Sequence, residues 1–274
     1  MAAPPLSPSE PCDARPALTA ASALGPFFAW SSWSDQAGWR SLAELLDGEV
    51  LAERVDAAAA TLRARCDLPV DAVPVRVVAS VTFLGLAARL VSPPLGAAVV
   101  GGALPLASLD DLWWRPPTAG PWPVAHGPLD ALPSGDLDDR AVTTALVETA
   151  VQGPVRLLLD AFRAQFRLSP HVLWGNVAAA LAGAAGVLSD TAPAHAERAG
   201  AVLAVALELP PLAGTGTVVR PDPDRARRFL VRRNCCLYYR IPGGGTCGDC
   251  VLTSPSQLRR HWRAVLAGTG KPPA

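Results

Sequence analysis

The sequence predicts a mainly α protein, in which a helical body with an irregular, short-strand middle region precedes a small C-terminal lobe. Half of the 274 residues are hydrophobic, and much of the chain up to residue 215 shows apolar residues at helical spacing. Residues 109–135 hold six prolines and three tryptophans, which indicates an extended stretch with a short hairpin. Beyond Pro210-Pro211 the composition changes. We expect a loose lead-in over residues 1–20, a body over 21–215 and a lobe over 216–270.

The first strong helical pattern begins at Ser41, which can form a capping box with Glu44. Apolar residues then recur at helical spacing to about Cys66, and Gly48 interrupts the pattern only weakly. We therefore expect one helix from Ser41 to Cys66.

The segment Val75–Val91 is apolar almost all round, although it contains Arg76 and Arg89. It is short for a membrane span, so it predicts a helix at the centre of the core, with buried strands as the alternative. Pro93-Pro94 and the glycines after it are expected to break this element.

Further helices are predicted after the proline-rich stretch. Ser169 and Pro170 have the residue types of an N-cap and a first helical position. The helix they begin carries small residues on one face, which would let another helix approach closely. The predicted segments are Leu137 to Gln152, Val155 to about Leu168, Pro170 onward, 194–208, and a last helix that begins near Thr253 or Ser254 with Pro255.

Charge is unevenly distributed along a chain whose net charge is zero. From Arg220 to Arg263 there are ten arginines against three aspartates, a net charge of +7, whereas residues 1–219 carry −8. The balanced total gives no general attraction to nucleic acid. The lobe itself could attract an anionic ligand or an acidic protein.

Four of the six cysteines fall in this positive lobe, as Cys235, Cys236, Cys247 and Cys250, with the spacing C-C-x10-C-x2-C. The N-terminus lacks the basic start and apolar run of a secretory signal, so we expect a cytoplasmic protein with reduced thiols. Four thiolates match the ligands of a [2Fe–2S] cluster. The glycine inside the last pair would let backbone amides approach the sulfurs.

Two other interpretations of the cysteines stay open. Zinc also accepts four thiolates, but zinc sites usually use two C-x2-4-C pairs, and adjacent cysteines in an extended chain point to opposite sides. A redox disulfide between Cys247 and Cys250 would leave Cys235 and Cys236 without a role. Spacing and compartment together favour the iron–sulfur cluster.

The cysteine spacing resembles that of the ferric siderophore reductases of the FhuF type. Arg232-Arg233-Asn234 before the first pair and Leu237-Tyr238-Tyr239-Arg240 after it are similar too, as is His171–Asn176 in the helical part. The resemblance is specific over about the last fifty residues. It implies a [2Fe–2S] cluster held by Cys235, Cys236, Cys247 and Cys250.

The same resemblance implies an oxidoreductase for iron uptake, which reduces Fe(III) in a hydroxamate-type siderophore and releases Fe(II) in the cytoplasm. Its partners would be the ferric siderophore and a separate ferredoxin- or flavoprotein-like electron donor. We expect no nucleic acid partner, and leave open a peripheral contact with the inner face of the membrane. The alternatives are an iron–sulfur electron-transfer or sensor protein with another acceptor, and a zinc-stapled binding module without redox activity.

Residues beyond the cluster ligands are weaker candidates. The chain has no P-loop or GxSxG motif, and we expect no bound nicotinamide or flavin and no catalytic residue beyond the cluster. Cys12 and Cys66 are predicted to be bystanders. One conflict stays open: nearby arginines would raise the reduction potential, whereas reduction of chelated iron needs a low one. The candidate substrate-binding residues are Arg232, Arg233, Arg240, Trp174 and Asn176.

Overall fold

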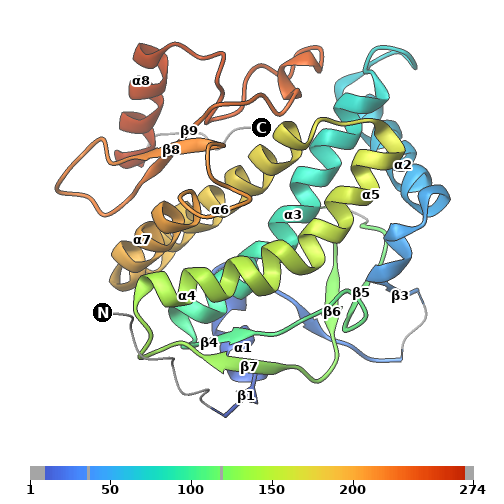
Figure 1. The fold of residues 1–274 in the computed structure, drawn as a ribbon. Helices are drawn as coiled ribbons and strands as arrows, with labels where there is room; N and C mark the ends of the chain where they lie inside the picture. The colour runs from blue at the N-terminus through green and yellow to red at the C-terminus, as the bar shows by residue number, and fades with distance from the viewer. Residues whose placement is uncertain (1–9, 36–37, 118–119, 269–274) are drawn as a thin grey trace.

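A computed structural model describes residues 10–35, 38–117 and 120–268 (Figure 1). Helices hold 54% of these described residues and strands 11%, which confirms the mainly α prediction. The α-helices are α1 (Arg15–Ser22), α2 (Gly48–Cys66), α3 (Val75–Val100), α4 (Asp139–Leu146), α5 (Arg156–Phe166), α6 (Pro170–Thr191), α7 (Ala196–Ala206) and α8 (Pro255–Leu266). Short 3-10 segments are η1 (Leu42–Leu46), η3 (Pro193–His195) and η4 (Tyr238–Arg240), and a π-helical stretch, η2 (Val147–Val155), joins α4 to α5.

The strands are short and form three small sheets. One has the order β1-β7-β4, one β2-β6-β5-β3, and the third is the β8-β9 hairpin. The β5–β6 pair is antiparallel and lies in the proline- and tryptophan-rich stretch, which confirms the predicted hairpin there. The strands are β1 (Cys12–Asp13), β2 (Ser31–Ser32), β3 (Arg40–Ser41), β4 (Ala103–Pro105), β5 (Leu112–Trp114), β6 (Val124–His126), β7 (Asp130–Pro133), β8 (Gly216–Val219) and β9 (Phe229–Arg232).

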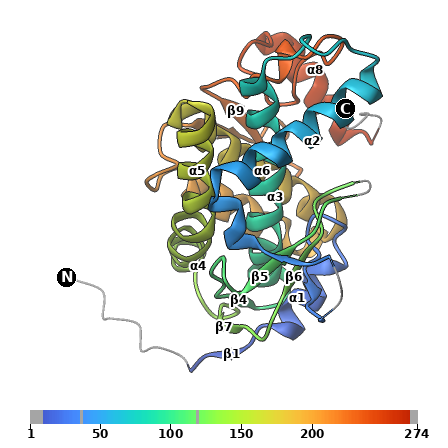
Figure 2. The ribbon, with the colours of Figure 1, turned by 90° about the vertical axis from the view of Figure 1, so that its right-hand side faces the viewer.

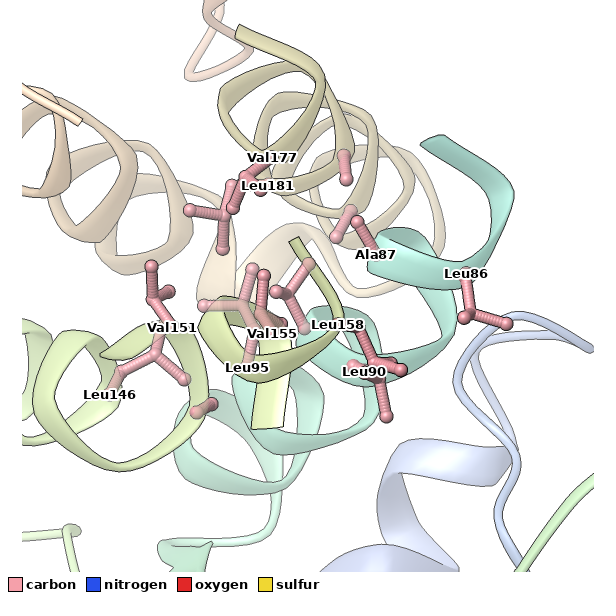
Figure 3. Close-up of a cluster of buried hydrophobic side chains, with 14 of the residues drawn as sticks. Leu86, Ala87, Leu90, Leu95, Leu146, Val151, Val155, Leu158, Val177 and Leu181 are labelled. Carbon is pink, nitrogen blue, oxygen red and sulfur yellow. The ribbon is translucent and has the colours of Figure 1, made fainter. Parts of the chain in front are cut away.

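Helix α3 is the centre of the body, as its apolar sequence predicts. Most of its residues from Val77 onward are buried, and it packs against α6, α1 and α2. Figure 3 shows Leu90 and Leu95 of α3 meeting Leu158 of α5 and Val177 and Leu181 of α6. Full burial of such side chains contributes about 1.5–3 kcal/mol each, so this contact anchors the fold.

The predicted break at Pro93-Pro94 is wrong, because α3 continues through both prolines to Val100. Pro93 has no amide hydrogen to donate to the carbonyl of Arg89, four residues earlier. The indole Nε1 of Trp30 donates to that carbonyl instead, at 2.9 Å. A side chain distant in sequence therefore satisfies the backbone group that proline leaves without a partner.

The N-terminal segment is also more ordered than predicted over residues 10–20. Helix α1 buries Ala17, Leu18 and Ala21 and packs against α3, so these residues belong to the body. The remainder of the predicted lead-in, residues 1–9, lies outside the described residues.

The helix predicted from Ser41 begins later. Ser41 precedes the short η1, and Asp47 is the N-cap of α2, with Oδ1 accepting from the amides of Glu49 and Val50 at 2.9 and 3.1 Å. Gly48 is thus the first residue of α2 rather than an interruption. Its end at Cys66 agrees with the prediction, and Asp67 there has a left-handed φ of +50°.

Helices α3 and α6 are long and apolar enough to cross a membrane by length and composition. Their most apolar windows are 67% and 61% buried inside the molecule. This is weak evidence for a span, because the core helix of a soluble protein has the same features.

The C-terminal lobe, residues 216–268, lies along α6 and α7 and reaches one end of α3 (Figures 1 and 2). It contains β8, β9, η4, α8 and the loops between them. Helix α8 has the predicted start: Ser254 and Gln257 form a reciprocal capping box, with Pro255 in the first turn. All four cysteines of the motif are in this lobe.

Candidate metal centre

The four lobe cysteines lie in the two loops between β9 and α8. Cys235 and Cys236 follow β9, whereas Cys247 and Cys250 precede α8. Cys236 and Cys250 are buried at 2% exposure each, and Cys235 and Cys247 are half-buried. The loops therefore bring both pairs from the sequence motif to one end of the lobe.

A sharp turn directly after the adjacent pair explains how these loops fold. Leu237 has a φ of +69°, a left-handed conformation that costs a residue with a Cβ about 1 kcal/mol or more. The turn aims the Leu237 amide at Cys235 Sγ, at 3.3 Å. In the second pair, the Leu252 amide donates to Cys250 Sγ at 3.4 Å. Each pair of cysteines thus has an amide donor of the kind that stabilises thiolate ligands.

Two of the sulfurs are close enough to share one metal. Cys236 Sγ lies 3.5 Å from Cys247 Sγ. Two thiolates on one tetrahedral metal, with bonds of about 2.3 Å, lie about 3.8 Å apart. The hydrogen bond between these two sulfurs lowers the pKa of Cys236 to about 6, and it raises the pKa of Cys247. Cys236 is therefore disposed to be a thiolate near neutral pH.

The donor set fits a two-iron cluster. Burial raises the pKa of Cys235, and the charges of the nearby Cys236 and then Cys250 raise it further. As placed, the described His, Cys, Asp and Glu side chains form no group of three or more that could hold a metal ion. Cys236 and Cys247 form one close pair of sulfurs. A [2Fe–2S] cluster takes two thiolates on each iron, so Cys235 and Cys250 would supply the other two.

Buried hydrogen bonds tie the first pair to the helical body. Ser80 of α3 donates from Oγ to the Cys236 carbonyl at 2.8 Å. Asn176 of α6 donates from Nδ2 to both the carbonyl and the hydroxyl of Ser80, at 2.9 and 3.0 Å. Both polar side chains are fully buried and bonded. They hold the Cys236 backbone at a fixed place on the body.

Gly175 of α6 lies under the residue that precedes the cysteines. A Cβ at this position would meet Asn234 Oδ1 at 1.7 Å, far inside any allowed contact. A larger residue here would force the Asn234 side chain to move. The Gly175-Asn176 pair of the family-like segment therefore supports the cysteine loop.

Ion pairs between the lobe and the body use the opposite charges that the sequence shows. Arg227 pairs with Asp190 of α6. Arg220 and Arg228 both pair with Glu197 of α7, at 2.8 and 3.5 Å. Much of the positive charge of the lobe is thus neutralised where it faces the body.

A cavity of about 690 Å³ separates α8 from α6 and α3. Helix α3 packs closely against α6, as the small residues of α6 predict, and Ala178 and Ala185 of the small-residue face are buried. Ala179, Ala182 and Gly183 of that face line the cavity instead. Cys236 and Cys247 lie in its wall. Apolar side chains form most of the lining, and they include Val81 and Leu84 of α3 and Trp262 and Val265 of α8.

Of the five candidate substrate-binding residues, Arg232 lines this cavity and the other four do not. Asn176 and Arg232 are buried, and Arg232 Nη2 donates to Asn176 Oδ1 at 2.8 Å, so we assign both a positioning role. Trp174 is half-buried and packs against the core. Arg233 and Arg240 are exposed. Substrate contact stays a prediction for all five residues.

Sequence reasoning missed Ser80, Asp249 and the cavity lining. A serine inside an apolar helix was the available signal for Ser80, since a buried hydroxyl needs a partner. Outside the lobe, Cys12 lies in β1 with its thiol directed at the Ala131 carbonyl, and Cys66 is exposed at the end of α2.

The fold and the site define a mainly α protein with a four-cysteine metal lobe. Residues 232–252 match the family model described as the FhuF 2Fe-2S C-terminal domain. The match bears out the resemblance drawn from the motif, and the cofactor of the lobe is a [2Fe–2S] cluster. The matched domain accordingly indicates a siderophore-related iron–sulfur protein. A comparison with curated proteins gives no match.

Proposed function

We propose that this protein reduces Fe(III) in a hydroxamate-type siderophore by one electron and so releases Fe(II) in the cytoplasm. A [2Fe–2S] cluster supplies one electron at a time. The electron comes from a separate ferredoxin- or flavoprotein-like donor. Fe(III) with one added electron becomes Fe(II), which binds the hard oxygen donors of a siderophore much more weakly. No bond of the ligand needs to break.

The observation that supports this proposal is the cavity beside the cysteines. An iron complex that enters it would lie next to Cys236 and Cys247, two of the cluster ligands. Its apolar walls would exclude water from the contact, and the small residues of α6 leave room for a ligand. His261 and Arg228 add polar groups at the lining.

Anaerobic mixing of the reduced protein with a ferric trihydroxamate and a ferrous chelator tests the proposal. We expect the cluster absorption to return as Fe(II) is trapped, in equal amounts. If no ferric hydroxamate reoxidises the cluster, siderophore reduction is wrong, and the protein transfers electrons to another acceptor.

A matched pair of variants tests the role of the cavity. Gly183 lines it, and a Cβ there meets nothing within 4 Å, so Gly183→Leu should fill the cavity without disturbing α6. We expect reoxidation by the ferric complex to slow by roughly tenfold or more. Gly85→Leu, at an equally open glycine of α3 that does not line the cavity, should leave the rate unchanged. Equal rates in both variants would place the acceptor elsewhere.

A further inference from the structure

A buried cation and an anion lie next to the cysteine loops. The Arg232 side chain is only 1% exposed, and its Nη1 lies 3.8 Å from Asp249 Oδ2. Asp249 sits between Cys247 and Cys250 and is itself 21% exposed. Both residues line the cavity together with Cys236 and Cys247.

Arg232 is fixed in place by the body. Its Nη2 donates to Asn176 Oδ1 at 2.8 Å, and its Nε donates to the Asn234 carbonyl at 3.1 Å. Asn176 is held in turn by Ser80, which also binds the Cys236 carbonyl. One chain of hydrogen bonds thus positions both the cation and a cysteine ligand.

Loop anchoring alone does not explain this ion pair. Arg232 Nη1 and Asp249 Oδ2 are buried atoms without a hydrogen-bond partner among the described residues. Removing two charges from water costs more free energy than an ion pair without a hydrogen bond recovers. Two neutral side chains could therefore anchor the loop instead. Only the two charges distinguish this pair from a neutral pair at the same positions.

Reduction of the cluster adds one negative charge beside these groups. A nearby cation stabilises the reduced form and an anion destabilises it, and both effects are strong where water is excluded. An exposed arginine at similar range acts weakly, because solvent and salt screen it. Most of the ten lobe arginines are exposed or paired with body carboxylates, so their summed charge has little effect.

We propose that Arg232 and Asp249 are positioning residues that set the reduction potential of the cluster in opposite directions, Arg232 raising it and Asp249 lowering it. Asp249 then offsets the rise in reduction potential that Arg232 causes. This inference rests on the [2Fe–2S] cluster and does not depend on siderophore reduction.

Potentiometric titration of the holoprotein, followed by visible absorption and electron paramagnetic resonance, tests it. We expect Arg232→Gln to move the midpoint to a more negative potential and Asp249→Asn to a more positive one. The matched control is Arg233→Gln, which removes the same charge from the exposed neighbouring residue and should leave the midpoint near that of the parent protein.

Conservative replacement separates charge from structure. Arg232→Lys keeps the charge, so its midpoint should lie closer to that of the parent than the midpoint of Arg232→Gln. If Arg232 and Asp249 only maintained the loop structure, Arg232→Gln and Asp249→Asn would both lose iron. Their midpoint potentials would then not shift in opposite directions.

Three results would overturn the inference. These are equal shifts in Arg232→Gln and Arg233→Gln, shifts of the same sign in Arg232→Gln and Asp249→Asn, and no shift in variants that retain full iron content. If Arg232→Gln does not hold a cluster, Asp249→Asn decides alone, and an unchanged or more negative midpoint contradicts the proposal.

Discussion

Hydrophobic side chains from α3, α4, α5 and α6 form one continuous core in the body, whereas the lobe depends on other contacts. Among the described residues, Leu230 is the member of that core that the lobe provides. The remaining buried hydrophobic side chains of the lobe include two cysteines and lie outside this core: Cys236, Ile241, Cys250, Leu258 and Trp262. The comparison shows a body stabilised by apolar burial and a lobe that relies on metal–thiolate bonds, buried hydrogen bonds and ion pairs.

The largest expected effect comes from the cluster ligands. Cys→Ser at Cys235, Cys236, Cys247 or Cys250 should lose or severely disturb the cluster, because each iron needs both of its thiolates. Iron and sulfide analysis with visible absorption measures this loss. Cys12→Ser and Cys66→Ser are the controls and should keep full iron content; an undisturbed cluster in any of the four variants would remove that residue from the ligand set.

Removal of the cluster should loosen the lobe and spare the body. Hydrogen exchange measured with and without the cluster should show faster exchange in residues 216–268, by about a hundredfold if roughly 3 kcal/mol of local stability is lost. Exchange in α3 and α5 should stay the same, since their contacts are apolar. Equal loosening of both regions would contradict the comparison.

A smaller effect should come from the close contact of the lobe with α6. Gly175→Ala places a Cβ on Asn234 and should destabilise the lobe by about 1–3 kcal/mol. Gly183→Ala, in the same helix but facing open space, should stabilise the protein by up to about 1 kcal/mol. Denaturant unfolding followed by cluster absorption compares the two, and a stabilised Gly175→Ala would show that the lobe sits elsewhere.

The smallest effect belongs to the ion pairs between lobe and body. Glu197→Gln removes the partner of both Arg220 and Arg228, yet these groups are partly exposed. We expect a loss of roughly 0.2–1 kcal/mol in the free energy of unfolding, which decreases in high salt. Asp160→Asn, at an exposed pair within α5, is a control that should leave the lobe unaffected. A loss of several kcal/mol at Glu197 would make charge, not the cluster, the main attachment.

Local features were predictable from the sequence. The start of α6 at Ser169-Pro170, the capping box of α8 and the cysteine pattern all depend on residues close together in the chain. The family match over residues 232–252 covers the same short cysteine pattern.

Long-range partners were not predictable. The continuation of α3 through Pro93 depends on Trp30, 59 residues from the carbonyl it binds. Ser80 and the Cys236 carbonyl are 156 residues apart, and Ser80 and Asn176 are 96 apart. Sequence patterns show that such polar residues need partners, but only the fold shows which partners they have.

Metal content and a one-electron titration of anaerobically purified protein test the central claim most directly. We predict a red-brown protein with about two iron atoms and two inorganic sulfides per chain, whose visible absorption bleaches on uptake of one electron. A colourless protein that holds one zinc ion per chain would contradict the account.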